Sequence, residues 1–176
     1  MYDVFSDLIK VLLPAGLVLY AVFQVVRAFL NKQLIEKQQE TRSEAFRQVL
    51  PLRLQAYERL SLLLERLSPN ALLLRNVPQV VTSLDLQQVL VAEIREEVHH
   101  NAAQQMYVSN ELWDRVRLVS HELTSLVNKA AAEVSPDAPA IELARKIGEH
   151  AVGRPSELWQ ETLNAVKNEA RQLWES

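Results

Sequence analysis

The chain has 176 residues, 48% of them apolar, with no cysteine and a formal net charge of -3. This slightly acidic balance gives no general attraction to phosphate backbones, so nucleic acid is not an expected partner. Only three glycines are present, which leaves few positions for tight hairpin turns and argues against a strand-rich fold. We therefore expect an all-α protein.

The first element in chain order is an apolar segment. Only Lys10, Gln24 and Arg27 interrupt the stretch from Leu8 to Leu30, which is long enough for a helix to cross a bilayer core of about 30 Å. The preceding tail has two aspartates and no cation, and no small-residue cleavage site follows, so a removed signal peptide is disfavoured. We expect a tail and transmembrane helix over residues 1–30. A buried helix of a soluble protein is the alternative.

Cations give this segment an orientation. Lys10 is the only Lys or Arg on its N-terminal side, and these residues stay preferentially in the cytoplasm. The C-terminal side carries Arg27, Lys32, Lys37, Arg42 and Arg47. The pattern predicts a single-pass protein with its N-terminus outside and its C-terminal part in the cytoplasm, where the absence of cysteine fits a reducing compartment. The same cations could instead serve a lipid-surface module that binds anionic lipid.

One face of the apolar helix has a composition suited to helix contacts. Ala21, Gln24 and Ala28 follow Leu17 at spacings that keep them on one side of a helix. Small residues let two helices approach closely, and an intramembrane amide can hydrogen-bond to another helix. These three residues are partner-contact candidates, although Gln24 could instead be hydrated at the inner boundary.

The soluble part begins with a charged stalk. Residues 36–44 contain no large apolar side chain and no helix breaker, and Lys32 and Glu36 are spaced for pairing on a helix. We expect a charged helical stalk over residues 31–45 and a soluble helical bundle over residues 46–176. Three-four spacing and capping residues predict the following bundle elements. They are a helix starting at Leu50 with Pro51 in its first turn, an apolar connector over 71–77, a helix capped by Thr82 or Ser83 that runs to about 105, a helix capped by Ser109 or Asn110 that ends at 135, a short helix from Asp137 to between 148 and 153, and a last helix from Ser156.

The densest polar cluster runs from Glu93 to Asn101. It contains Glu-x-x-His twice, a spacing that di-iron helical bundles use, but neither His121 nor His150 has a glutamate three residues earlier to supply the other half. No motif for nucleophilic catalysis or phosphate binding is present. We therefore expect no catalytic, cofactor-binding or metal-binding residues. The alternative is a metal- or ligand-binding helical-bundle enzyme that uses Glu93, Glu96, Glu97, His99 and His100.

The same helix carries polar residues on its inward line. Leu90, Ile94 and Val98 point inward at about 100° per residue, and a continuing helix would place Asn101 and Gln105 on that line. Either the helix end emerges from the bundle or it meets another surface. In the second case the partner-contact candidates are Glu97, His100, Asn101 and Gln105.

Several stretches of the chain resemble an uncharacterised bacterial family. They are residues 53–60, 67–70, 100–101 and 105–109, within a similarity expected to cover residues 8–130. The family resemblance implies a single-span membrane protein with a cytoplasmic helical domain, and hence the bacterial inner membrane. It implies no activity and no site residues.

An anchor joined to a domain without catalytic motifs favours a non-catalytic adaptor or accessory subunit of an inner-membrane protein complex. The expected partners are the lipid bilayer and either another membrane protein or further copies of this chain.

Overall fold

The chain is helical throughout the part that the structure describes. The computed structural model describes the backbone of residues 2–175 and the side chains of residues 16–174 apart from 18, 42 and 154. No β-strand occurs in this part, which confirms the all-α prediction. The elements are α1 (Tyr2–Leu67), α2 (Pro69–Asn76), η1 (Val77–Gln79), α3 (Ser83–His100), η2 (Ala102–Met106), α4 (Asn110–Ala131), α5 (Ala140–Ala151) and α6 (Arg154–Glu175).

The chain divides into two compact units, residues 1–49 and residues 50–176. The first unit is part of α1 alone, whereas the second contains the last turns of α1 and all the other elements. The division falls beside Pro51, which has no backbone N–H to donate to the carbonyl of Arg47. The sequence predicted a new helix at Leu50, but α1 continues through this proline.

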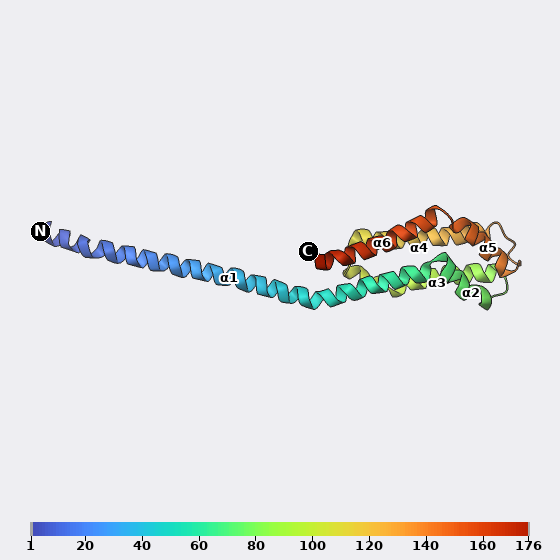
Figure 1. Cartoon of the computed structure of the whole chain (residues 1–176), viewed down its shortest axis with the longest axis horizontal. Coiled ribbons are helices and arrows are strands. Elements are labelled where there is room, and N and C mark those ends of the chain that lie inside the picture. Colours follow the sequence, from blue (N-terminus) through green and yellow to red (C-terminus); the bar gives the residue numbers. More distant parts are fainter. Residues whose placement is uncertain (1, 176) are drawn as a thin grey trace. The chain divides into compact units, whose positions relative to one another are not determined.

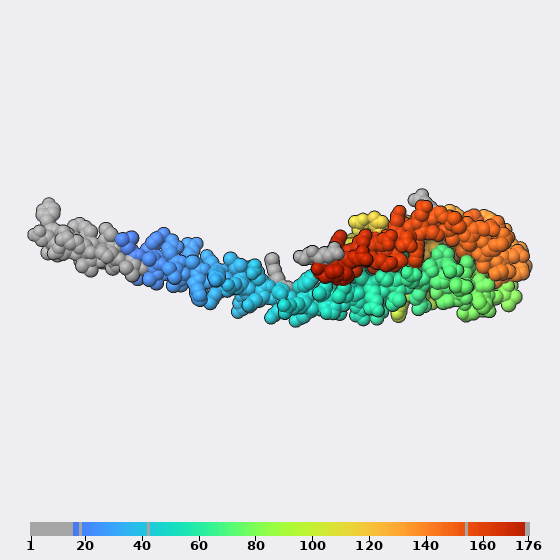
Figure 2. All heavy atoms as spheres, viewed as in Figure 1, coloured from blue at the N-terminus to red at the C-terminus, as the bar shows by residue number. Residues whose placement is uncertain are grey.

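Among the described residues, no helix is both long and apolar enough to cross a membrane. The predicted span starts at Leu8, and the side chains of residues 8–15 and 18 lie outside the described part. Every residue from 19 to 41 is exposed, which covers all faces of the helix because one turn takes 3.6 residues. Figure 2 shows these side chains in blue to cyan. The exposed large apolar ones are Leu17, Leu19, Tyr20, Val22, Phe23, Val25, Val26, Phe29, Leu30, Leu34 and Ile35.

The second unit is an antiparallel helical bundle. α3 packs along α4, and α4 packs along α6, as Figure 1 shows. Gln87 near the start of α3 donates to Asn128 near the end of α4, 2.9 Å away, as expected for antiparallel neighbours. The last turns of α1 are tied to α6 by Trp159 and to α3 by an ion pair of Arg66 with Glu97. α2 and α5 contact each other at the end of the bundle where α1 stops.

The bundle is closed by a single apolar core. Its fully buried large side chains include Leu60, Leu64, Leu67, Leu86, Leu90, Ile94, Leu112, Val116, Leu143 and Ile147. These residues come from α1, α3, α4 and α5, and they follow the three-four spacing that the sequence shows. The helix faces that the apolar spacing identifies therefore form the core.

Capping residues define several helix starts. The Thr82 hydroxyl accepts from the backbone N–H of Asp85, and the Ser109 hydroxyl accepts from that of Leu112, so at each start the first of the two candidate residues is the cap. Ser68 caps α2 in the same way, so the predicted connector over 71–77 is in fact mostly helical. α5 begins at Ala140 rather than near Asp137, because the chain before it pairs with residues 81–84 through backbone hydrogen bonds.

The end of α3 differs from the prediction. The sequence favoured a helix to about Gln105, whereas α3 stops at His100 and a 3₁₀ helix follows. Asn101 is the C-terminal capping residue of α3: its backbone N–H makes the regular helical bond to the carbonyl of Glu97, and its side-chain amide competes for the same carbonyl. A short amide side chain that competes for backbone groups favours such a termination.

Candidate functional site

Three of the predicted contact residues meet in a groove between α1 and α3. Glu97, His100 and Asn101 line a hollow of about 380 Å³ together with residues of α1 that include Arg59 and Leu62. His100 is exposed, whereas Asn101 is only 5% exposed and is bonded to its own helix. We call this hollow the α1–α3 groove.

Glu97 already has a partner within this groove. Its carboxylate lies 3.1 Å from the guanidinium Nε of Arg66, and its side chain is 16% exposed against 57% for the arginine. The pair therefore ties α1 to α3. It leaves His100 and the α1 side chains as the accessible groups of the groove.

Gln105 lies apart from the other three residues. It is exposed in η2 and lines a different hollow, between α3 and α4. If α3 had continued as an α-helix, Gln105 would lie on its inward face. However, α3 ends at His100. The bundle candidates thus divide between two grooves.

The glutamates of the predicted cluster differ in their contacts and exposure. The Glu93 carboxylate accepts from the guanidinium of Arg75 at 2.6 Å and from the amide of the buried Asn76. Glu96 and His99 are exposed. Within the part of the chain that the structure describes, no three His, Asp or Glu side chains are arranged to hold a metal ion.

The candidates of the first unit lie on an exposed helix surface. Ala21, Gln24 and Ala28 are all exposed. The Gln24 side-chain amide donates to the hydroxyl of Tyr20, one turn earlier, at 2.7 Å. The amide thus has a hydrogen-bond partner on its own helix, which lowers the cost of placing it in an apolar environment.

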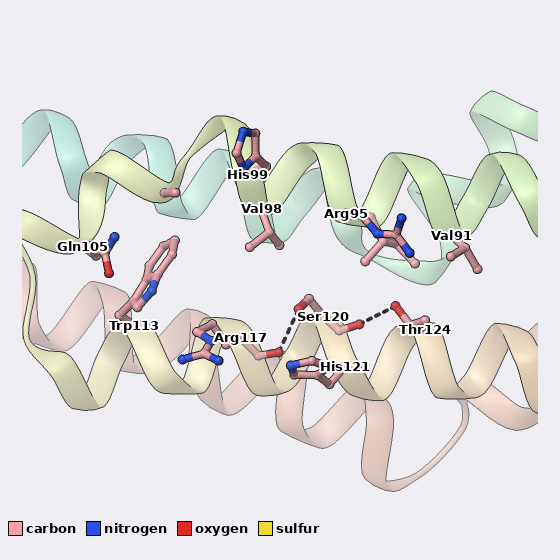
Figure 3. A pocket seen from close by; sticks show the side chains of 12 residues that line it. Val91, Arg95, Val98, His99, Gln105, Trp113, Arg117, Ser120, His121 and Thr124 are labelled. Carbon is pink, nitrogen blue, oxygen red and sulfur yellow. Dashed lines mark hydrogen bonds between the residues drawn. The ribbon is translucent and has the colours of Figure 1, made fainter.

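A second groove, between α3 and α4, is larger. It has a volume of about 550 Å³, and Figure 3 shows its lining side chains on the two helices, with Val91, Arg95 and Val98 directed into the space between them. We call it the α3–α4 groove. The apolar residues on one side are Val91, Ile94 and Val98 of α3 and Ala102 of η2, and Trp113 from α4 closes one end. These apolar side chains form a stripe along this side of the groove.

Basic side chains accompany this stripe. Arg95 and His99 are four residues apart on α3, and Arg117 and His121 are four residues apart on α4, so each helix brings an Arg-x-x-x-His pair to the groove. None of the described residues that line the groove is Asp or Glu. Asp114 lies beside it, 3.8 Å from Arg117, with both side chains largely exposed.

The α3–α4 groove was not predicted from the sequence. His99 and His121 were considered only as metal ligands, whereas here they accompany arginines. The repeated Arg-x-x-x-His spacing was the available signal, but only the antiparallel packing of α3 on α4 shows that the two pairs face one hollow.

A polar network joins three helices where the second unit begins. The Glu169 carboxylate on α6 accepts from the Tyr57 hydroxyl at 3.0 Å and from the backbone N–H of Ser109 at 2.8 Å. Arg53 donates to the Tyr57 oxygen at 2.9 Å. Burial raises the pKa of Tyr57; the Arg53 hydrogen bond opposes this shift, and the one to Glu169 adds to it. The network holds α1, α4 and α6 together.

Comparison with known proteins places this all-helical bundle in a family. The chain belongs to a family of unknown function, DUF7935, whose sequence profile matches residues 3–173. This confirms the expectation of an uncharacterised family and extends the matched region beyond the expected residues 8–130. Searches of curated proteins and of solved structures found no match.

Proposed function

We propose that this protein is a membrane-anchored helical adaptor or accessory subunit of an inner-membrane protein complex. In this proposal the helix over residues 8–30 lies in the bilayer, the N-terminus is outside, and the bundle is in the cytoplasm. The bundle and the anchor then contact another membrane protein or a second copy of the chain.

The exposed apolar surface of the first unit carries the proposal. Phe23 is 59% exposed, Val25 68% and Phe29 59%, and neighbouring side chains are similar. Burying a side chain of this size in an apolar environment contributes about 1.5–3 kcal/mol. So many large apolar groups on all faces of one helix favour its insertion into lipid or its burial by other helices.

The charge pattern supports the proposed orientation. Cations follow the apolar stretch, beginning with Arg27 and Lys32, while its N-terminal flank offers Lys10 alone. Lys32 is paired with Glu36 at 3.7 Å, but both side chains are highly exposed, so this pair leaves the cation available to the headgroup region.

Two surfaces are proposed for partner contacts. In the membrane, Ala21 and Ala28 leave room for a neighbouring helix beside Gln24. On the bundle, the α1–α3 groove presents Arg59, Leu62 and His100, and Leu62 is 56% exposed. An exposed leucine between polar groups is suited to the centre of a modest interface.

Protease accessibility tests the anchor and its orientation. We expect added protease to spare a C-terminal epitope tag in intact spheroplasts and to remove it after the membrane is permeabilised. A cytoplasmic protein serves as the control for intactness. Removal of the tag in intact spheroplasts contradicts the orientation, and recovery of the chain in the soluble fraction after lysis contradicts the anchor.

Crosslinking in native membranes tests the adaptor role. We expect a crosslinked partner or homo-oligomer, less of it with Gln24→Leu, and less with the double change Arg59→Ala and His100→Ala. Arg171→Ala, an exposed cation on α6, is the control and should change nothing. A chain that stays monomeric, with all variants equal to wild type, contradicts the proposal.

A further inference from the structure

We propose that the α3–α4 groove binds a single-chain anionic amphiphile, a molecule with one alkyl chain and a carboxylate or phosphate head group. This ligand site is separate from the proposed partner surfaces. It does not depend on the anchor.

The dimensions of the groove favour a small elongated ligand. Its volume of about 550 Å³ lies within the range of roughly 300–1,000 Å³ that small-molecule sites occupy. The α3 part of the wall, from Val91 to Val98, is about 10 Å long at the helical rise, which suits a short alkyl chain.

The apolar wall provides contacts for the chain. Val91, Val98 and Ala102 are only partly buried, whereas Ile94 and Trp113 are buried at the base. An alkyl chain along this wall would cover apolar surface that the bundle leaves open, with the usual gain from removing such surface from water. Val91 and Val98 lie on one face of α3, on either side of the buried Ile94, so an alkyl chain along the groove can contact both.

The charges of the groove provide contacts for an acidic head group. Arg95 and Arg117 supply guanidinium groups suited to carboxylate and phosphate, and His121 on α4 adds a ring N–H donor. The Ser120 and Thr124 hydroxyls already donate to backbone carbonyls of α4. The arginines are therefore the principal groups for an anion. Asp114 competes for Arg117 only weakly, since both are solvent-exposed.

Methyl NMR of the full chain, kept in a neutral amphipol, tests the site with octyl phosphate as the probe. We expect saturable shifts of the Val91 and Val98 methyl groups and a quenching change in Trp113 fluorescence. The double change Arg95→Gln and Arg117→Gln should weaken binding about fivefold, as for the loss of two exposed charge contacts. Val98→Phe should block it by filling the groove.

Matched controls separate this site from general partitioning and charge effects. Arg145→Gln with Arg171→Gln removes the same charge from α5 and α6 and should leave the affinity unchanged. Octyltrimethylammonium tests the sign of the head group, and inorganic phosphate tests the need for the chain. Any of three results overturns the proposal: the two octyl compounds bind equally, the two double variants have equal effects, or inorganic phosphate binds as tightly as octyl phosphate.

Discussion

The indole N–H of Trp159 donates to the backbone carbonyl of Leu64, 2.7 Å away. This carbonyl lies in the last turn of α1, where the regular partner would be the N–H of Ser68. That N–H bonds instead to the carbonyl of Glu65. The tryptophan on α6 thus satisfies a group that the helix end leaves unpaired.

Replacing this donor tests how much the contact stabilises the bundle. Trp159→Phe keeps an aromatic ring but removes the N–H, which leaves the Leu64 carbonyl without its partner. We expect the free energy of unfolding to fall by about 2 kcal/mol, measured by urea denaturation. Trp174→Phe, at a position 61% exposed, is the matched control and should change it by less than about 0.5 kcal/mol.

The Glu93 carboxylate is expected to act structurally. Glu93→Gln removes the charge that Arg75 and the buried Asn76 bind, and partial exposure moderates the loss. We expect a decrease of about 1–2 kcal/mol in unfolding free energy, with and without added divalent metal. Glu96→Gln, at an exposed position of the same helix, should have little effect. A metal-dependent gain in stability that only Glu93→Gln abolishes would contradict this assignment.

Alkaline pH should weaken the network around Tyr57. Burial, the largest effect, raises its folded-state pKa above the ordinary value of 10.0, so the unfolded chain releases this proton first. The resulting stability is fully present below pH 10 and is lost as pH rises through the folded-state pKa. Denaturation of wild type and Tyr57→Phe across this range should show a steeper decline for wild type. Parallel declines would show that Tyr57 ionisation is not linked to folding.

Acidic titration tests a surface cluster between α4 and α5. The hydrogen bond from Lys146, at 3.1 Å, and then that from His150 hold the pKa of Glu133 below its ordinary 4.5. Its contribution is therefore present above pH 4.5 and is lost as pH falls through the folded-state pKa. Carboxyl NMR should show the Glu133 pKa rising in Lys146→Met. Arg145→Met, which removes a neighbouring cation that does not bond Glu133, should raise it less.

Much of the bundle could be predicted because local signals determine it. The helix starts at Thr82 and Ser109 lie within one residue of the prediction, since a hydroxyl that accepts from a first-turn N–H acts over three residues. The end of α3 could not be placed, because the apolar spacing allowed a longer helix while Asn101 bonded back to Glu97. Helix ends depend on such competition more than on periodicity.

The candidate surfaces were predictable only in part. Glu97, His100 and Asn101 are near one another in sequence, and they do share a groove. Arg95 and Arg117 line the α3–α4 groove from two different helices, and only tertiary packing determines which helix faces meet. The partner, the ligand and the insertion of α1 into a membrane are predictions, and each has its own experiment.

The link between Leu64 and Trp159 also bears on how the protein is synthesised. The last turns of α1 leave the ribosome roughly 90 residues before the tryptophan that covers their carbonyl. At about 5–20 residues per second, the Leu64 carbonyl waits about 5–20 s for the indole of Trp159. We expect chains truncated before α6 to aggregate.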